Sequence, residues 1–331
     1  MLKGLYILDN HDQIYSNEVQ EEIKKYVEII APPQSKETIR GNKALLAEVE
    51  IIFTGWGAPQ FDHALLDIAS NLKVVFYGAG SVKKIVSDAF WERNIILTTA
   101  ASANAIPTAE FAFSQIIFSL KRGWYHVLKM KKHKEETRRE EAAGAYGATV
   151  GLISLGAVGR HVAKLLQNLE VKVIAFDPYV SGIRASELNI QLHSLEEVFS
   201  LSDVVSIHSP HLPETEGMIT GQHIASMKKN TTLINTARGQ IVRQEEMLDI
   251  LNQRPDLYAV LDVTHPWKLK PHSSLYQLYN LDNVIITPHI AGSQSKECHR
   301  MGKYMLDELK RYMRGEPLKW LVTKDMFDLM A

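Results

Sequence analysis

The stretch that most constrains the fold is Ala148–Asp177, in which two short apolar runs flank a glycine turn and a helical pattern. The first run, Thr149–Ser154, and the second, Val171–Phe176, are typical of buried parallel strands. Gly156 and Gly159 directly follow the first run. This order predicts a βαβ unit whose glycine turn leads into a helix N-terminus.

The glycine turn predicts a dinucleotide site, because backbone N–H groups and the positive helix end can bind a pyrophosphate there. Asp177 follows Gly159 by 18 residues, where a carboxylate binds ribose hydroxyls and repels a 2′-phosphate, which favours NAD over NADP. Ser154 holds the first of the three glycine places of the fingerprint, so we expect modest strain there. The glycine spacing alone is a weak signal, since a βαβ unit with small residues at its turn can also bind nothing.

Composition bounds the class of protein. The chain has 331 residues, enough for two domains, and a formal net charge of -1, so no charge excess favours nucleic acid or an anionic membrane. The single Cys298 excludes an internal disulfide and suits a reducing cytoplasm. The N-terminal residues read as a strand and not as a signal peptide, and no apolar run is long enough to span a bilayer. No Cys/His cluster has metal-ligand spacing. We therefore expect a cytoplasmic protein with no metal and no nucleic-acid or membrane partner.

Strands alternate with helical patterns on both sides of the glycine turn, which indicates parallel sheets with helices on their faces. The predicted strands besides those of the βαβ unit are Lys3–Leu8, Glu50–Thr54, Val74–Tyr77, Ile95–Thr98, Val204–His208, Thr232–Asn235, Tyr258–Leu261 and Val284–Thr287. Two successive α/β segments predict an α/β protein of two Rossmann/flavodoxin-like doubly wound parallel-sheet domains, with an active-site cleft between them.

Several helices are predicted from apolar periodicity. Val82–Arg93 is expected to be helical, and Pro107 is expected to be the first residue of a long helix that is apolar on more than one face. A partner subunit is one candidate for covering that helix. The mixed-charge run Lys129–Glu141 is expected to be a solvated helix end or arm. Ser295–Arg314 is predicted to be the last helix, ended by Gly315.

Polar residues that can carry chemistry follow the predicted strands, at the sheet edge where ligands of parallel sheets bind. Arg238 has a planar fork suited to a carboxylate, and His289 can give or take a proton near neutral pH. Together with a hydride carrier they predict interconversion of a 2-oxo acid and a 2-hydroxy acid. The alternatives are a surface arginine on a turn and a histidine that only hydrogen-bonds its own turn. His208 is expected to be a neighbour of the cofactor rather than an acid–base group.

On these residues the chain resembles the D-isomer-specific 2-hydroxyacid dehydrogenases. The segments that carry the resemblance are Gly151–Asp177, Ser202–His208, Pro213–Thr215, Ile234–Gly239, Leu261–Val263, Thr287–Gly292 and Gly315–Leu318. The resemblance implies a discontinuous substrate-binding (catalytic) domain made of residues 1–102 and 293–331. It also implies an inserted NAD-binding Rossmann domain of residues 103–292, and a homodimer joined through the NAD-binding domains.

The resemblance also implies residue roles. Arg238 would hold the substrate carboxylate and carbonyl, and His289 would protonate the new hydroxyl. Backbone N–H groups of Ala79 and Gly80 would hold the carboxylate, and Asp262 would face the nicotinamide amide. The residues expected to bind the cofactor are Leu155, Gly156, Ala157, Val158, Gly159, Asp177, Pro178, Tyr179, His208, Pro210, Thr215, Thr236, Ala237, Asp262, His289 and Gly292.

The chain departs from the family at one catalytic position. The family typically has a glutamate five residues after the aspartate, paired with the histidine, but here that place is held by Trp267, and no carboxylate occurs between Asp262 and Asp282. Without a carboxylate partner, His289 should be less often protonated at neutral pH. Trp267 could form an apolar wall of the substrate pocket, or it could pack in the core or at a domain interface.

The main interpretation is an NAD-dependent oxidoreductase that transfers a hydride between nicotinamide C4 and C2 of a 2-hydroxy or 2-oxo acid, whose identity stays open. The alternative is a non-catalytic or weakly active NAD(H)-binding sensor or scaffold on the same fold. Trp267 and Ser154 favour the alternative. Arg238 and His289 argue against it, because a sensor needs neither.

Overall fold

The computed structural model describes residues 1–134, 136, 138 and 140–330, which form two compact units. One unit consists of Met1–Asn104 together with Ser293–Ala331, and the other of Ala105–Gly292. The resemblance implied boundaries after residues 102 and 292, and the division here falls after residues 104 and 292. The assignment of substrate binding to the first unit and of NAD binding to the second stays a prediction.

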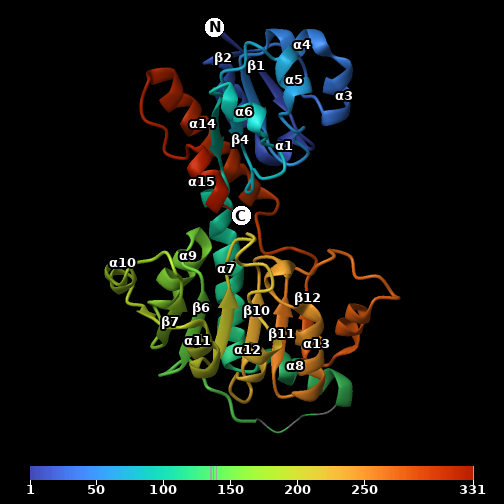
Figure 1. Ribbon diagram of the computed structural model, residues 1–331, viewed down its shortest axis with the longest axis vertical. Coiled ribbons are helices and arrows are strands. Elements are labelled where there is room, and N and C mark those ends of the chain that lie inside the picture. The colour runs from blue at the N-terminus through green and yellow to red at the C-terminus, as the bar shows by residue number, and fades with distance from the viewer. Residues whose placement is uncertain (135, 137, 139, 331) are drawn as a thin grey trace. The chain divides into compact units, whose positions relative to one another are not determined.

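The first unit is built on a five-stranded parallel sheet with the strand order β2-β1-β3-β4-β5 (Figure 1). This is the flavodoxin-like order of a doubly wound sheet. Its elements are β1 (Leu2–Ile7), α1 (His11–Ile14), α2 (Asn17–Lys24), β2 (Val27–Ile29), α3 (Lys36–Gly41), α4 (Lys43–Glu48), β3 (Ile51–Thr54), α5 (His63–Ile68), β4 (Val74–Tyr77), α6 (Asp88–Glu92), β5 (Ile96–Thr99), α14 (Lys296–Arg314) and α15 (Lys324–Leu329).

Both faces of this sheet are buried, because successive side chains of a strand point to opposite sides. Leu5 and Ile7 of β1 belong to a core covered by α3, α4, α5 and α6. Tyr6 and Leu8 belong to a second core covered by α1, α2 and α14. The strands are apolar along their whole length because helices cover both faces of the sheet. Gly315 ends α14 in the left-handed conformation (φ 67°), as the sequence predicted.

The second unit is built on a seven-stranded parallel sheet with the order β12-β11-β10-β9-β6-β7-β8 (Figure 1). The chain runs outward from β6 to β8 and then returns to β9 on the other side of β6, so the topology switches between β6 and β9, where ligands of such sheets bind. Its elements are α7 (Ala101–Leu120), which starts in the first unit, α8 (Gly123–His133), β6 (Thr149–Ile153), α9 (Ala157–Leu166), β7 (Lys172–Phe176), α10 (Gly182–Glu187), β8 (Gln191–Leu192), α11 (Leu195–Leu201), β9 (Val204–Ile207), α12 (Gly221–Ala225), β10 (Thr232–Asn235), the 3₁₀ helix η1 (Gly239–Ile241), α13 (Gln244–Gln253), β11 (Tyr258–Leu261), the 3₁₀ helix η2 (Ser274–Asn280) and β12 (Val284–Ile286).

This sheet is also covered on both faces. Helices α7, α9 and α10 pack on one face, where Val150 and Leu152 point, and helices α11, α12 and α13 pack on the other, where Ile153 and Val205 point. The carboxyl edge of the sheet, which carries the polar residues singled out in the sequence, is therefore held between two helical layers. The predicted α/β class with two doubly wound parallel sheets is confirmed.

Two helix predictions were wrong. Helix α7 begins at Ala101, so Pro107 lies inside it and is not its first residue. The alanine-rich segment before the proline favours helix strongly, and Thr99 Oγ1 accepts a hydrogen bond from Ala101 N (3.2 Å) at the helix start. A proline there removes one intrahelical bond, which a 20-residue helix can lose. The predicted helix Val82–Arg93 is helical only over Asp88–Glu92.

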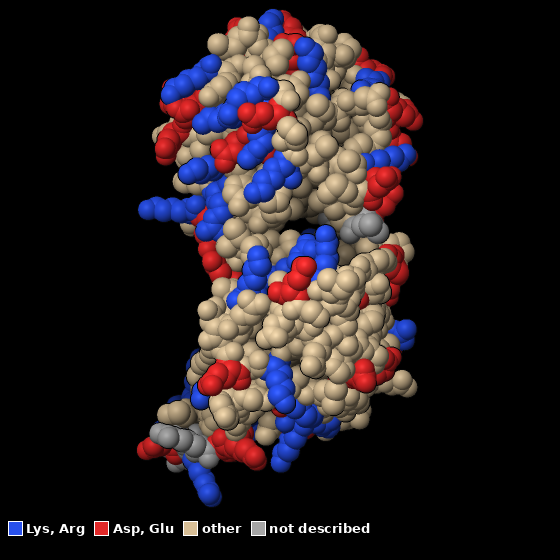
Figure 2. All heavy atoms as spheres, turned by 90° about the vertical axis from the view of Figure 1, so that its left-hand side faces the viewer, with Lys and Arg blue, Asp and Glu red and all other residues tan. Residues whose placement is uncertain are grey.

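The surface of the chain agrees with its balanced charge. Figure 2 shows Lys and Arg side chains interspersed with Asp and Glu over the face in view. In the described part of the chain, no helix is both long and apolar enough to cross a membrane. The charged run Lys129–Glu141 begins in the last turns of α8; residues 135, 137 and 139 of that run lie outside the described residues.

Candidate active site

The glycine turn joins β6 to α9, and its two glycines have different surroundings. Gly156 precedes the first residue of α9, where no side chain caps the helix, and no atom lies within 4 Å of the place that a Cβ would take. A Cβ at Gly159 would lie 2.2 Å from the Ser154 carbonyl oxygen. Gly156 therefore leaves open space above uncapped N–H groups, which suits a phosphate, while Gly159 allows the helix to pack against the strand end.

Ser154 at the first place of the fingerprint has a φ of 77°, a left-handed conformation that glycine adopts without strain. Its Oγ donates to Asp177 Oδ2 (3.3 Å), and the same oxygen accepts from Leu155 N (2.7 Å). Asp177 Oδ1 accepts from Tyr179 N (2.8 Å) and Val180 N (3.1 Å). The carboxylate is thus held beside the glycine turn, as the sequence predicted for a ribose-binding group.

The two glycines give a matched pair of substitutions. We expect Gly159→Ala to destabilise the chain by about 1–3 kcal/mol, because the new methyl must displace backbone. We expect Gly156→Ala to cost less than about 1 kcal/mol, since the site is open, yet to weaken NADH binding at least about tenfold by occupying the space over the N–H groups. Thermal unfolding and NADH fluorescence titration measure the two effects. Equal loss of stability in both variants would contradict this division of roles.

His208 and Thr236 follow the neighbouring strands β9 and β10, and their buried polar atoms have no hydrogen-bond partner among the residues that the structure describes. These atoms are Nδ1 and Nε2 of His208 and Oγ1 of Thr236. Buried polar groups normally have partners, so orphaned atoms at the ligand edge of the sheet fit a bound polar group such as the cofactor. Burial lowers the pKa of His208 to about 3, which favours the neutral imidazole at physiological pH. Its expected place beside the cofactor stays a prediction.

Most of the other predicted cofactor residues lie at the same edge. Thr215 Oγ1 donates to the Pro210 carbonyl (2.6 Å) and accepts from Leu212 N (2.8 Å), which fixes the loop after β9. The remaining ones are Leu155, Ala157 and Val158 in the glycine turn and the first turn of α9, Pro178 and Tyr179 after β7, Ala237 after β10, and Gly292 after β12.

Arg238 lies after β10 on a turn that its own neighbours hold. The Asn235 side chain accepts from Ala237 N (3.0 Å) and donates to the Arg238 carbonyl (2.9 Å), and Arg238 Nη1 donates to the Ala237 carbonyl (2.6 Å). Within the described residues no carboxylate forms an ion pair with the guanidinium. Partial burial lowers the pKa of Arg238, which stays cationic at neutral pH. A half-buried cation without a counter-ion suits an anionic ligand.

Asp262 directly follows β11 and is buried, and its carboxylate accepts hydrogen bonds from the loop after β12. Its Oδ1 accepts from Thr287 Oγ1 (2.6 Å) and Ile290 N (2.8 Å), and its Oδ2 accepts from Ala291 N (2.9 Å). His289 lies between these donors, so Asp262 positions the loop that carries the imidazole. No motif in the sequence indicates these hydrogen bonds. The predicted contact of Asp262 with the nicotinamide amide stays a prediction.

His289 has a left-handed backbone (φ 56°), and its ring lies against the ring of Trp267, with 4.9 Å between the centroids and 53° between the planes. Partial burial lowers the pKa of His289. The charge of Asp262 raises this pKa, and the charge of Arg238 lowers it. The three residues follow the adjacent strands β10, β11 and β12 and interact electrostatically. The structure thus brings together the arginine and histidine that the sequence singled out.

Ala79 and Gly80 follow β4 of the first unit, and their carbonyls are fixed while their N–H groups are not used. Thr99 Oγ1 donates to the carbonyls of Ala79 (3.0 Å) and Gly80 (2.7 Å), and Ala100 N donates to Ala79 (3.1 Å). Neither N–H donates to an acceptor among the described residues. Such a pair can bind an anion, which agrees with the predicted role and does not test it.

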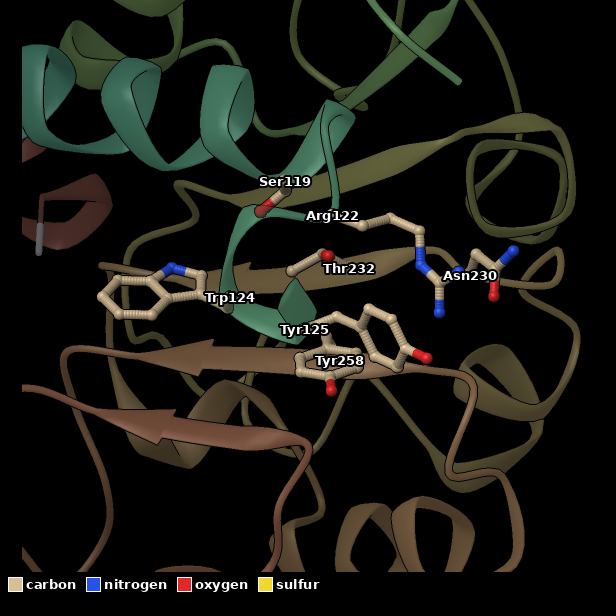
Figure 3. A pocket seen from close by; sticks show the side chains of 7 residues that line it. All are labelled: Ser119, Arg122, Trp124, Tyr125, Asn230, Thr232 and Tyr258. Carbon is tan, nitrogen blue, oxygen red and sulfur yellow. The ribbon is translucent and has the colours of Figure 1, made fainter. Parts of the chain in front are cut away.

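A small pocket at the opposite edge of the seven-stranded sheet contains none of these residues (Figure 3). It is lined by Ser119, Arg122, Trp124, Tyr125, Asn230, Thr232 and Tyr258. Arg122 Nη1 donates to Glu140 Oε2 (3.2 Å), and the guanidinium lies 4.1 Å from the centroid of the Tyr125 ring. Thr232 and Tyr258 begin their strands, so this cluster lies away from the carboxyl edge.

Among the described residues no three His, Cys, Asp or Glu side chains are grouped to hold a metal.

Comparison with known proteins identifies the family. Residues 114–291 match the family model described as "D-isomer specific 2-hydroxyacid dehydrogenase, NAD binding domain". The match covers more than half of the chain and includes the glycine turn, Arg238 and His289. The chain belongs to the D-isomer specific 2-hydroxyacid dehydrogenase family. NAD follows as its cofactor, as the glycine turn and Asp177 predicted.

Relatives and solved structures within this family agree. The D-3-phosphoglycerate dehydrogenase of Archaeoglobus fulgidus is 31% identical over 258 residues, which cover 78% of this chain and 48% of that protein. The Bacillus subtilis protein of the same name is 27% identical over 268 residues, which cover 80% of this chain and 50% of that protein. The chain spans about half the length of the curated relatives it matches. A D-isomer specific 2-hydroxyacid dehydrogenase of Lactobacillus delbrueckii ssp. bulgaricus, in its NAD-complexed form, has a TM-score of 0.82 at 22% identity and covers 97% of this chain and 100% of that one. For D-mandelate dehydrogenase of Rhodotorula graminis the TM-score is 0.80 at 22% identity, with 98% of each chain covered.

Proposed function

We propose that this chain is an NAD-dependent oxidoreductase that interconverts a 2-oxo acid and a D-2-hydroxy acid. The observation that carries the proposal is the Arg238 guanidinium, which forms no ion pair with a carboxylate of the described residues, in the same row of strand ends as the His289 imidazole. A carboxylate bound by that guanidinium places the neighbouring C2 carbonyl within the same row. A protein that only senses NAD needs neither a cationic group that binds a carboxylate nor a histidine that transfers a proton.

In this proposal NAD supplies and accepts the hydride, and the chain's own residues bind, orient and protonate. Arg238 binds the substrate carboxylate and polarises the C2 carbonyl. As hydride reaches C2 during reduction, the His289 imidazolium gives its proton to the carbonyl oxygen, so that a hydroxyl forms and the imidazole becomes neutral. Asp262 is a positioning residue, since its oxygens hold the His289 loop.

A screen tests this proposal against the sensor alternative, which Trp267 at the usual glutamate place still favours. NADH oxidation is followed with a panel of small and bulky 2-oxo acids, from mildly acidic to neutral pH. Turnover of any of them supports the dehydrogenase. Measurable NADH binding without turnover of any acid would favour the sensor.

Trp267→Glu tests how His289 is tuned. In the native chain partial burial keeps the His289 pKa below its ordinary value. The imidazolium needed for reduction is therefore lost as pH rises through that lowered pKa. A carboxylate at position 267 stabilises the imidazolium and raises the pKa, so the falling limb of the reductive pH–rate profile should move by about one unit or more to higher pH. A profile of Trp267→Glu that overlays the native one would show that position 267 does not act on the imidazole.

We also infer a homodimer, because α7 and α8 expose the apolar side chains of Ile117, Phe118, Val127 and Met130. The single Cys298 favours a cytoplasmic location. Burying these apolar side chains against a second copy removes this surface from water. Sedimentation equilibrium should give twice the chain mass, and the double change Val127→Glu and Met130→Glu should give monomers. A native monomer at micromolar concentration would contradict the inference.

A further inference from the structure

The residue that distinguishes this site is Trp267, which lies at the imidazole with much of its own surface uncovered. Its ring contacts the His289 ring (4.9 Å between centroids), while 46% of the residue remains exposed. Large apolar side chains left open beside a reactive group are a common sign of ligand binding. The exposed indole surface therefore needs an occupant that is itself apolar.

The position of Trp267 is set by the backbone around it. Thr264 Oγ1 donates to the carbonyl of Pro266 (3.0 Å) within the same loop. The side chain of Gln244, at the start of α13, donates to the His265 carbonyl (2.5 Å) and accepts from His265 N (3.0 Å). These hydrogen bonds hold the loop of residues 264–267 to α13, in the same unit as the Arg238 turn.

Two further contacts tie this loop to the site and to the core. A Cβ at Gly239 would lie 2.4 Å from the Thr264 carbonyl carbon and 2.5 Å from His265 N, so the loop packs directly on the backbone that follows Arg238. Leu269 is buried in the core below. An indole held from both ends of its loop can act as a fixed wall, because little entropy is lost when a ligand packs on it.

Trp267 brings no charge to the imidazole. The charged groups that act on His289 are Asp262 and Arg238. The Asp262 oxygens accept hydrogen bonds from the loop of residues 287–291, and in the described chain no carboxylate hydrogen-bonds the His289 ring. The side of the ring at Trp267 is therefore apolar.

We propose that Trp267 is the specificity-determining residue of this site, and that its indole packs on the side chain of 2-oxo acids with a large apolar, preferably aromatic, substituent at C3. This inference rests on the proposed function, which supplies the C2 carbonyl at His289. It adds the substrate class: the apolar wall favours an acid such as phenylpyruvate over pyruvate or glyoxylate. An added aromatic ring can gain both buried area and ring–ring contact there.

The test compares phenylpyruvate with pyruvate as substrates for the native chain, Trp267→Ala and Trp267→Phe. We expect the native kcat/KM for phenylpyruvate to exceed that for pyruvate by at least about tenfold. Trp267→Ala should remove most of this preference by raising KM for phenylpyruvate about tenfold or more, with little change in KM for pyruvate. Trp267→Phe should retain the preference. Tyr279→Ala, which removes another exposed aromatic ring of the same unit, is the matched control and should leave both values unchanged.

The outcomes separate this inference from the proposed function. Turnover of pyruvate with equal or higher efficiency than phenylpyruvate would overturn the inference and leave the dehydrogenase standing. An equal loss of kcat/KM for both acids in Trp267→Ala would also overturn it, because loss of a purely structural residue lowers kcat/KM for all substrates together. Turnover of another acid of the panel but of neither phenylpyruvate nor pyruvate would also overturn the inference alone. No turnover of any acid of the panel, with NADH bound, would overturn the proposed function itself. Thermal unfolding and NADH titration of each variant show that the folded, cofactor-binding protein is being compared.

Discussion

Replacing His289 with alanine is expected to reduce turnover of 2-oxo acids by about 100- to 10,000-fold, the range for loss of a general acid. NADH affinity should change by no more than about twofold. The His289 side chain is not hydrogen-bonded to the glycine turn, Asp177 or Thr236, the groups expected to hold most of the dinucleotide. The loop that carries it is held through Asp262 and its backbone partners, so the variant should fold.

Steady-state NADH oxidation and NADH fluorescence titration measure the two halves of this prediction. His272→Ala serves as the matched control, because His272 is an exposed histidine in the same unit that is assigned no role. Its turnover should equal the native value. Native turnover in His289→Ala would refute the acid–base assignment, and joint loss of turnover and NADH binding would place His289 in cofactor binding instead.

The acid–base role of His289 also predicts how the rates of reduction and oxidation by the native chain change with pH. Reduction needs the imidazolium and oxidation needs the neutral imidazole. Because partial burial lowers the pKa of His289, reductive kcat/KM should fall with rising pH from a point below the ordinary histidine value of about 6.5. Oxidative kcat/KM should already be near its plateau at neutral pH. Both limbs should disappear in His289→Ala.

The strands and the nucleotide turn could be predicted from the sequence because their signals are local. The run Thr149–Ser154, the glycines that follow it and Asp177 lie within one βαβ unit, and each has the place that its pattern indicates. The start of α7 was missed because Pro107 is a strong local signal for a helix start. The alanine-rich segment and the Thr99 hydroxyl outweigh that signal.

The parts of the site that the sequence did not reveal depend on contacts between distant residues. Asp262 accepts hydrogen bonds from donors 25 to 29 positions further on, and no motif marks such a clamp. Trp267 could be recognised as a departure from the family pattern. Its contact with the His289 ring, and the anchoring of its loop by Gln244, emerge only when β11, β12 and α13 are packed together.

Arg238→Lys should lower kcat/KM for 2-oxo acids by about 100- to 1,000-fold, and Arg238→Met by more. Lysine keeps the charge but loses the planar fork that binds a carboxylate through two parallel hydrogen bonds. Loss of one member of a buried charged pair costs about 2–5 kcal/mol, and the guanidinium here is half-buried with no counter-ion in the described chain. Because the proposed function gives Arg238 both the carboxylate and the C2 carbonyl, KM should rise and kcat should fall together.

The comparison needs a control for the arginine itself and a way to restore it. Arg243→Lys changes an exposed arginine that pairs with Glu246 (3.1 Å) at the start of α13, and it should leave both constants unchanged. In Arg238→Ala, added guanidinium ion should recover part of the lost rate with 2-oxo acids, because it can occupy the vacated space and bind the carboxylate. Unchanged KM in Arg238→Met would mean that the carboxylate binds elsewhere. The backbone N–H groups of Ala79 and Gly80 would then be the next groups to test.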